Sequence, residues 1–449
     1  MASLTYLILA ANLLLTVNQD STEVTDIDFK PEADALHLKV TEAESNPDAE
    51  SQFLKAAKSD YHFEANDPSF QQALTSGSVW FSYRMRFEWV ELEPLKSAEA
   101  LTGRIQLGYG TSSYRGFSGY TDFTGVRAIG ADRYNAAGLN ERPDFAVVAD
   151  PEVTVLNQLY GQFENDSADL QLRIGRQRII HQDARFIGNV GWRQNEQTYD
   201  AATFRSSLGV DDLNLQYNYL WQVNRIFGPG HDQGVFDSSA HLMLAEYRGF
   251  PGQISLSVFY YHLDFDNAPA LSSGTAGLRA EGDLPAGERL TLSWKGAFAE
   301  QSDAGDNPDS YSASYYKADL ALRQGTDWSV GGSYEVLGSD DGQASFKTPL
   351  ATLHAYQGWA DQFLVTPDVG LRDLSFGGSA LLISDIRFSA RYHSYQSDTG
   401  SISFGSEINF SAARPFGEYW SLLVKYARFS AEDAGIDTQK LWLQAQFQF

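Results

Sequence analysis

Hydrophobic and polar residues alternate with a period of two along most of the chain after Gly77. In the segment 79–89, the odd positions carry large apolar side chains, namely Val79, Phe81, Tyr83, Met85, Phe87 and Trp89, and the even positions 82–88 carry Ser, Arg, Arg and Glu. Successive side chains of a β-strand point to opposite faces of the sheet. The segment therefore predicts a strand with one apolar and one charged face.

The same alternation recurs in later segments, most clearly in 212–224, 288–299, 327–336, 385–395 and 438–449. We count about eighteen such segments, each close to the roughly ten residues that a tilted strand needs to cross a bilayer. The weakest lie near 116–128, 239–248 and 274–283. A soluble sandwich would also alternate, but its apolar face would meet a second sheet. Charges on one face and aromatics on the other favour a membrane barrel.

The connections between these segments are sorted by length. Those after odd-numbered strands are mostly long, namely 129–152, 179–197, 225–238, 264–273, 300–310 and 338–371, and those after even-numbered strands are short, namely 112–114, 164–167, 249–252, 284–287, 324–326 and 413–417. Outer-membrane barrels have long extracellular loops and short periplasmic turns. This sorting predicts that both termini are periplasmic. The final residue, Phe449, resembles the C-terminal aromatic of outer-membrane proteins.

The predicted fold is all-β, with a single transmembrane antiparallel β-barrel of about eighteen strands over residues 69–449. A short helix around Ser69 to Leu74 precedes it. Residues 1–18 form a degenerate signal-like apolar segment, with no Lys or Arg before the apolar run. Residues 19–68 are acidic and weakly patterned, and we expect a flexible extension. A barrel of this size is too wide for side chains alone to fill, so it forms a channel unless loops plug it.

Composition narrows the function classes. The 9 Trp, 23 Tyr and 28 Phe suit the aromatic girdles of a membrane barrel. The net charge of −25 argues against a nucleic-acid partner. The chain has no cysteine, and its histidines fall in no catalytic motif, so we expect no enzyme activity and no cofactor or bound metal. The acidic loops 303–309 and 338–342 do not have EF-hand spacing and are interpreted as solvated loops.

Two segments go beyond barrel patterning. They are GRQRIIHQDARFIGNVGWRQNEQTYDA at 175–201 and TPLATLHAYQGWADQFLVTPDVGLRDLSFG at 348–377. Together with DRYN at 132–135 and VVADPEVTVLNQ at 147–158, they resemble the alginate-export family of outer-membrane channels. The resemblance implies an eighteen-stranded barrel of the Gram-negative outer membrane that passes an anionic polysaccharide such as alginate outward through a basic pore. It also implies a periplasmic delivery complex.

A polyuronate path needs fixed positive charge, and arginine binds carboxylates bidentately. The candidate pore residues are Arg84, Arg86, Arg104, Arg173, Arg176, Arg178, Arg185 and Arg193. Two interpretations stay open: a basic belt at the constriction, or ion pairs with Asp183, Glu88, Glu196 and Asp200 that brace a folded-in loop. The candidate loop residues are Trp359, Asp361, Phe363 and Arg372. They form either a lid or vestibule, or a packed loop with its own small core.

Three functions are weighed on this basis. The first is a secretion channel for an anionic polysaccharide. The second is a nutrient porin, general or anion-preferring, for small solutes. The third is a plugged barrel that serves in surface structure or adhesion. Outer-membrane lipid and lipopolysaccharide surround the barrel in all three. The charge of −25 disagrees with a polyanion conduit unless the acidic residues lie outside the pore.

Overall fold

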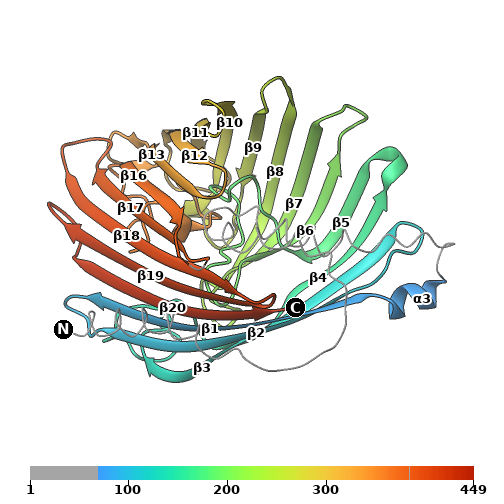
Figure 1. The fold of residues 1–449 in the computed structure, drawn as a ribbon, viewed down its shortest axis with the longest axis horizontal. Coiled ribbons are helices and arrows are strands. Elements are labelled where there is room, and N and C mark those ends of the chain that lie inside the picture. The colour runs from blue at the N-terminus through green and yellow to red at the C-terminus, as the bar shows by residue number, and fades with distance from the viewer. Residues whose placement is uncertain (1–68, 384) are drawn as a thin grey trace.

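The computed structural model describes residues 69–383 and 385–449, so the predicted segments 1–18 and 19–68 lie outside the described residues. One antiparallel sheet of 18 strands closes on itself, because β1 (Ser78–Leu92) pairs with both β2 (Ala98–Gly110) and β20 (Thr438–Gln448). Figure 1 shows the resulting ring of strands. The predicted fold class is confirmed.

The remaining barrel strands follow in chain order. They are β3 (Phe117–Arg133), β4 (Val153–Asn165), β5 (Leu170–Gln177), β6 (Thr198–Ser206), β7 (Leu213–Asn224), β8 (Val235–Phe250), β9 (Ile254–Leu263), β10 (Ser273–Pro285), β11 (Thr291–Asp303), β12 (Ser312–Gln324), β13 (Trp328–Leu337), β16 (Leu371–Leu381), β17 (Arg387–Gln396), β18 (Ser403–Phe416) and β19 (Trp420–Ala431). The three weakly patterned segments are β3, β8 and β10, each longer than the sequence predicted.

A short helix, α3 (Phe70–Thr75), precedes β1 as predicted. It begins with a capping box: the hydroxyl of Ser69 accepts from the backbone N–H of Gln72, and the Gln72 side chain accepts from the Ser69 N–H. Tyr109 of β2 donates to the carbonyl of Leu74 and so ties the helix to the barrel. Within the described residues, no helix is long and apolar enough to cross a membrane.

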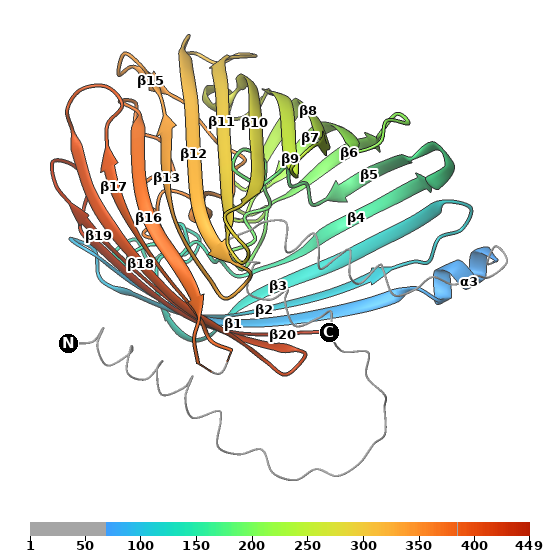
Figure 2. The same ribbon diagram turned by 45° about the horizontal axis from the view of Figure 1, so that its top comes forward.

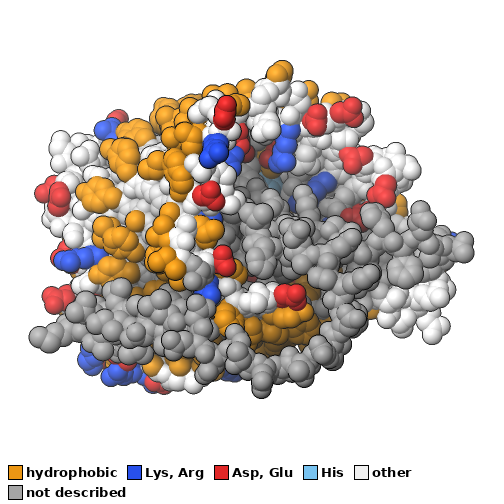
Figure 3. All heavy atoms as spheres, viewed as in Figure 1, with side chains coloured by type: hydrophobic (Ala, Val, Ile, Leu, Met, Phe, Trp, Pro, Cys, Tyr) orange, Lys and Arg blue, Asp and Glu red, His pale blue; other side chains and the backbone are white. Residues whose placement is uncertain are grey.

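The alternation sorts side chains as expected. On β1, Ser82, Arg86 and Glu88 are buried in the interior, whereas Val79 and Met85 are exposed on the outside. Other exposed outward positions are apolar, including Phe123, Ile174, Leu320 and Phe376. Figure 3 shows hydrophobic side chains spread over the outer wall. An apolar exterior and a polar interior are what a bilayer-spanning barrel requires.

Long and short connections lie at opposite ends, which confirms the predicted sorting. The longest, 134–152, 178–197 and 338–370, share one end, and the shortest, including 251–253, 325–327 and 417–419, share the other. Helix α3 and Phe449 lie at the short-turn end. Which end faces the cell exterior stays a prediction.

Barrel closure is complete at the backbone level. Phe81 N donates to Phe449 O, and Phe449 N donates to Phe81 O, both at 3.1 Å. The register then continues from Ser82 opposite Gln448 to Leu92 opposite Thr438. In hydrocarbon each backbone donor and acceptor needs a partner, so only a sheet without a free edge can span it.

Candidate functional site: a lumen narrowed by two loops

Loop 178–197, between β5 and β6, lies inside the ring of strands (Figures 1 and 2). Ile179 and Ile187 belong to a buried cluster that includes Leu242 of β8 and Tyr261 of β9. Phe186 packs against rings of the wall, with centroid distances of 5.2 Å to Phe259 and 5.1 Å to Tyr315. These apolar contacts with the wall therefore hold loop 178–197 inside the lumen, away from the opening of the barrel.

Loop 338–370, between β13 and β16, meets the first loop inside the barrel. It contains a two-residue hairpin, β14 (Ser339–Asp340) and β15 (Ala344–Ser345), and a short 3-10 helix, Leu353–Ala355. Its backbone bridges to the first loop, with Gly188 N donating to Leu350 O at 2.8 Å and Thr352 N donating to Ala184 O at 3.0 Å. We call residues 178–197 and 338–370 together the inner layer.

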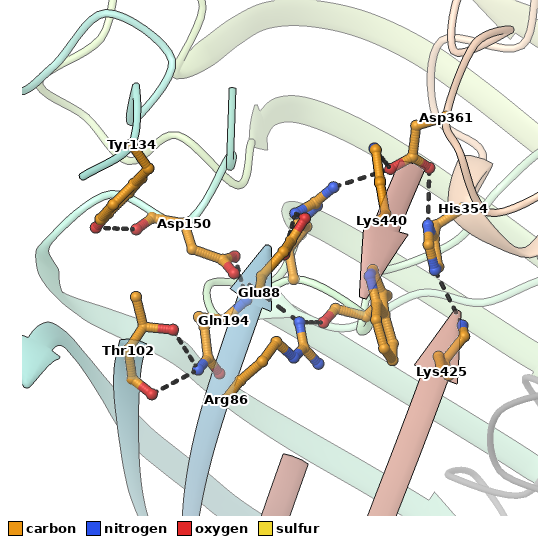
Figure 4. A network of polar contacts seen from close by, with 12 residues as sticks. Arg86, Glu88, Thr102, Tyr134, Asp150, Gln194, His354, Asp361, Lys425 and Lys440 are labelled. Carbon is orange, nitrogen blue, oxygen red and sulfur yellow. Dashed lines mark hydrogen bonds and ion pairs between the residues drawn. The ribbon is translucent and has the colours of Figure 1, made fainter. Parts of the chain in front are cut away.

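Charged side chains attach the inner layer to the wall where the barrel closes (Figure 4). Arg193 lies 3.2 Å from Glu88 Oε2 of β1 and 3.1 Å from Asp361 Oδ2. Asp361 also accepts from Lys440 Nζ and from His354 Nδ1, both at 2.7 Å. We call these five residues and Lys425 the seam network.

The contacts of the seam network determine the charge states of Asp361 and His354. Burial alone would raise the pKa of Asp361, but the Lys440 ammonium and the hydrogen bond from His354 hold it well below its usual range. Lys425 Nζ lies 3.0 Å from His354 Nε2. Because an ammonium only donates, Nε2 accepts, and the ring proton sits on Nδ1 and is donated to Asp361. His354 is therefore neutral in this arrangement.

Two of the predicted pore arginines, Arg84 and Arg86, contact the inner layer from the wall. Arg84 Nη1 donates to Gly191 O at 3.1 Å, and Arg86 Nη1 donates to Trp192 O at 2.6 Å. The Arg86 guanidinium also stacks 3.9 Å from the Trp192 ring centroid. Arg104 is only 4% exposed. Arg84 and Arg86 therefore hold loop 178–197 against β1.

Four further predicted arginines form ion pairs with carboxylates. Their shortest contacts are Arg176 to Asp200 at 2.7 Å, Arg178 to Glu196 at 2.5 Å, Arg185 to Glu335 at 2.7 Å, and Arg193 to Asp361 at 3.1 Å. Arg173 stands apart, with Nε donating to Gln162 and its guanidinium 4.2 Å from the Tyr160 ring. Whether any of the eight acts on a permeating solute stays a prediction.

The four predicted loop residues have different surroundings in the structure. Phe363 packs against Tyr395 and Phe404, with centroid distances of 4.7 and 5.5 Å. Trp359 lies 3.9 Å from Lys425 Nζ, and Asp361 is the hub of the seam network. Arg372, at the start of β16, binds Asp398 in the connection 397–402.

The sequence interpretation missed a cluster of cations on β10–β12 that faces the inner layer. Arg279 Nη1 lies 2.8 Å from Asp183 Oδ1, and Lys295 Nζ donates to Asp183 Oδ2 at 2.9 Å. Lys317, on the next strand, lines the same small cavity. Lys295 is one of the alternating polar positions of segment 288–299. The alternation shows that it faces the lumen, but gives neither its height in the barrel nor its partner.

Comparisons with known proteins agree on the fold. No family model matches the chain, and no curated protein matches it. Among solved structures, Acinetobacter baumannii OccAB2 superposes with a TM-score of 0.66 at 15% identity, covering 84% of this chain and 99% of that one. Pseudomonas aeruginosa OpdL gives 0.63 at 16% identity with the same coverages. Pseudomonas aeruginosa OpdK with vanillate gives 0.64 at 12% identity, again with the same coverages.

These structures correct the family expectation. The similar barrels are Occ and Opd porins, so the resemblance to the alginate-export family is wrong, and with it the expected polysaccharide export. Motif 175–201 contains loop 178–197 and its flanking strand residues, and motif 348–377 contains the second part of loop 338–370 and the start of β16. Several of their charged and aromatic residues, including Arg185, Arg193 and Trp359, attach these loops to the wall. Identities this low show the fold, an outer-membrane-type barrel, and no more.

Proposed function

We propose that this protein is a porin of the Gram-negative outer membrane through which small anionic solutes diffuse. The position of the inner layer carries the proposal. Two loops pinned inside an 18-stranded barrel reduce a wide opening to a restricted path. Lipid and lipopolysaccharide are the proposed surroundings of the apolar outer face.

The restricted path follows the wall from β10–β12 to β17, beside the seam network rather than through it. Charged, inward-facing side chains there keep contact with water, with exposed fractions of 41% for Arg323, 42% for Glu281 and 25% for Lys295. On the seam side, in contrast, the side chains of Arg193 and Lys440 are each 8% exposed. Ions and small solutes are therefore expected to pass along β10–β12 and β17.

The positively charged side chains on this wall favour the passage of anions over cations. Arg391 of β17 is exposed, and its Nη1 donates to Ser375 Oγ. A guanidinium has five donors, so Arg391 can also bind a solute anion. Vanillate, which carries a carboxylate, appears in the structure of the similar barrel OpdK. Glu281 and Asp283 share the wall, so we expect a graded preference for anions rather than exclusion of cations.

Single-channel recording in planar bilayers tests the proposal. We expect an open conductance with anion preference in KCl, and current block by vanillate. Lys295→Glu and Arg391→Glu should each lower the anion preference and weaken the block. Arg115→Glu, on an exposed turn at the short-turn end, is the matched control and should do neither. Cation preference in the unmodified channel, or no conductance, would overturn the proposal.

A further inference from the structure

Asp183 of the inner layer occupies the cation cluster of the wall. Its Oδ1 binds Arg279 at 2.8 Å and its Oδ2 binds Lys295 at 2.9 Å, so both carboxylate oxygens are engaged by wall cations. Both strand residues also contact Glu281, at 2.6 Å from Arg279 and 3.9 Å from Lys295. The loop therefore supplies one carboxylate to these two cations, Asp183, and the wall supplies another, Glu281.

The loop is built to present this one side chain. Gln182 and Ala184, on either side of Asp183, both have positive φ, at 54° and 62°. Residues with a Cβ rarely adopt this conformation, and they keep it only where surrounding contacts impose it. The contacts here are Ala184 N to His181 O at 2.9 Å and Tyr356 Oη to Asp183 O at 2.5 Å. Packing therefore holds a strained turn that aims Asp183 at the wall.

The third cation is less well satisfied. The closest carboxylate oxygens to Lys317 Nζ lie at 3.8 Å on Asp319 and 4.0 Å on Glu335, beyond hydrogen-bond distance. Its ammonium also lies 4.8 Å from the Tyr356 ring. Lys317 therefore remains able to bind an anion that reaches the cluster.

Space at the cluster is limited. Asp183, Arg279, Lys295 and Lys317 border a cavity of about 10 Å³. This is room for roughly one water molecule, too little for an additional carboxylate group. A solute anion can bind these cations only if the side chain of Asp183 moves away.

We propose that Asp183 is a tethered competitor: its carboxylate occupies the anion subsite formed by Arg279, Lys295 and Lys317, and a permeating anion crosses the constriction by displacing it. This inference rests on the proposed function as an anion-preferring porin. Burial alone would raise the pKa of Asp183, but Lys295 and Arg279 hold it well below its usual range, so the competitor stays charged. A tethered ligand competes at a high effective concentration. Asp183 thereby sets how tightly a solute anion is held.

The test compares Asp183→Asn with the unmodified channel in planar bilayers, using vanillate as the blocking anion. Without the competitor, the half-blocking concentration should fall by about threefold to tenfold, and the anion-to-cation permeability ratio in KCl should rise. Asp183→Glu keeps the charge and should stay close to the unmodified channel. Asp309→Asn removes an exposed carboxylate from the connection 304–311, and it should leave the block unchanged.

A second variant separates lost charge from a loosened loop. The chain has no cysteine, so Asp183→Cys carries a unique thiol. Attachment of a negatively charged methanethiosulfonate reagent restores a carboxylate-like charge at the same position, and the vanillate block should weaken again. An unaltered half-blocking concentration in Asp183→Asn overturns the inference while the porin proposal stands. Absence of anion preference and of block in the unmodified channel overturns both.

Discussion

The ammonium of Lys425 lies 3.0 Å from Nε2 of His354, and the rings of Trp192 and Trp359 enclose it at 3.9 Å each. Lys425 comes from wall strand β19, whereas His354 and Trp359 belong to loop 338–370 and Trp192 to loop 178–197. One wall side chain therefore contacts both halves of the inner layer. Cation–π contacts of this kind gain strength where water is excluded.

Lys425→Met should loosen the inner layer. The substitution leaves His354 Nε2 buried without a donor and removes the contacts to both Trp rings, which should cost about 1–3 kcal/mol of unfolding free energy. Denaturant unfolding in detergent micelles measures the loss. Lys96→Met is the control, because Lys96 forms an exposed ion pair with Asp144 and should cost less than about 1 kcal/mol. Equal losses for the two variants would contradict the contact described here.

Arg185→Met should be more damaging than the removal of both members of its ion pair. Arg185 and Glu335 are 3% and 4% exposed, and removal of the arginine leaves a buried carboxylate, at a cost of about 3–5 kcal/mol. The double variant Arg185→Met with Glu335→Gln should regain part of that stability. A complete double-mutant cycle in the same unfolding assay checks this, and additive losses would argue against direct coupling.

Gly358→Ala should disturb the clamp between loop 338–370 and β18. Gly358 has φ of +81°, and a Cβ there would lie 2.4 Å from Glu407 Oε2. Glu407 accepts from the backbone N–H groups of Trp359 and Ala360, so its displacement releases the loop. Gly138→Ala is the matched control, with φ of +90° and nothing within 4 Å of the added Cβ. We expect Gly358→Ala to lower the free energy of unfolding by about 1 kcal/mol or more beyond the loss in Gly138→Ala. Equal losses in the two variants would mean that backbone strain alone, and not the clash with Glu407, destabilises the protein.

Stability should fall with acidity because of His354. Burial and the Lys425 ammonium hold the pKa of His354 well below 6.5, so the folded state keeps it neutral while the unfolded state binds a proton. Its contribution is present above pH 6.5 and declines as the pH falls below that value, by at most about 1.4 kcal/mol per pH unit. Unfolding free energies at pH 7.5, 6 and 5 should show this slope. His354→Gln should lack that part of the slope.

The single-channel conductance should remain constant over the same range. The folded His354 stays neutral, and the pKa of Asp361 lies well below its usual range, so these two groups keep their charge states between pH 7.5 and 5. A collapse of conductance near pH 6 would mean that His354 gains a proton in the folded channel.

The barrel itself could be predicted from sequence because bilayer and lumen impose opposite demands on alternate residues. That contrast placed Arg86 inside and Met85 outside without any knowledge of the fold. Loop lengths likewise placed 179–197 and 338–371 among the long connections. The family resemblance was wrong, because the barrels that superpose on this chain are Occ and Opd structures.

The interior could not be predicted in the same way. The sequence pattern places Lys295 on the lumen face of a strand and Arg193 in a loop. It does not show how their environments differ. Arg193 is almost buried between two carboxylates, whereas Lys295 meets a loop carboxylate at the open side. The outcome depends on where each loop folds, which is set by distant contacts such as Phe186 on Phe259. Such contacts leave no local signal in the sequence.

The backbone bridge between Ile187 and Leu350 also orders events during biogenesis. Strands β6 to β13 lie between these residues in the chain, so the two loops meet only after that part of the wall has formed. Contacts this distant in sequence form late and slowly. We therefore expect a freshly inserted barrel to be wider than the mature one and, for a short time, to admit larger solutes.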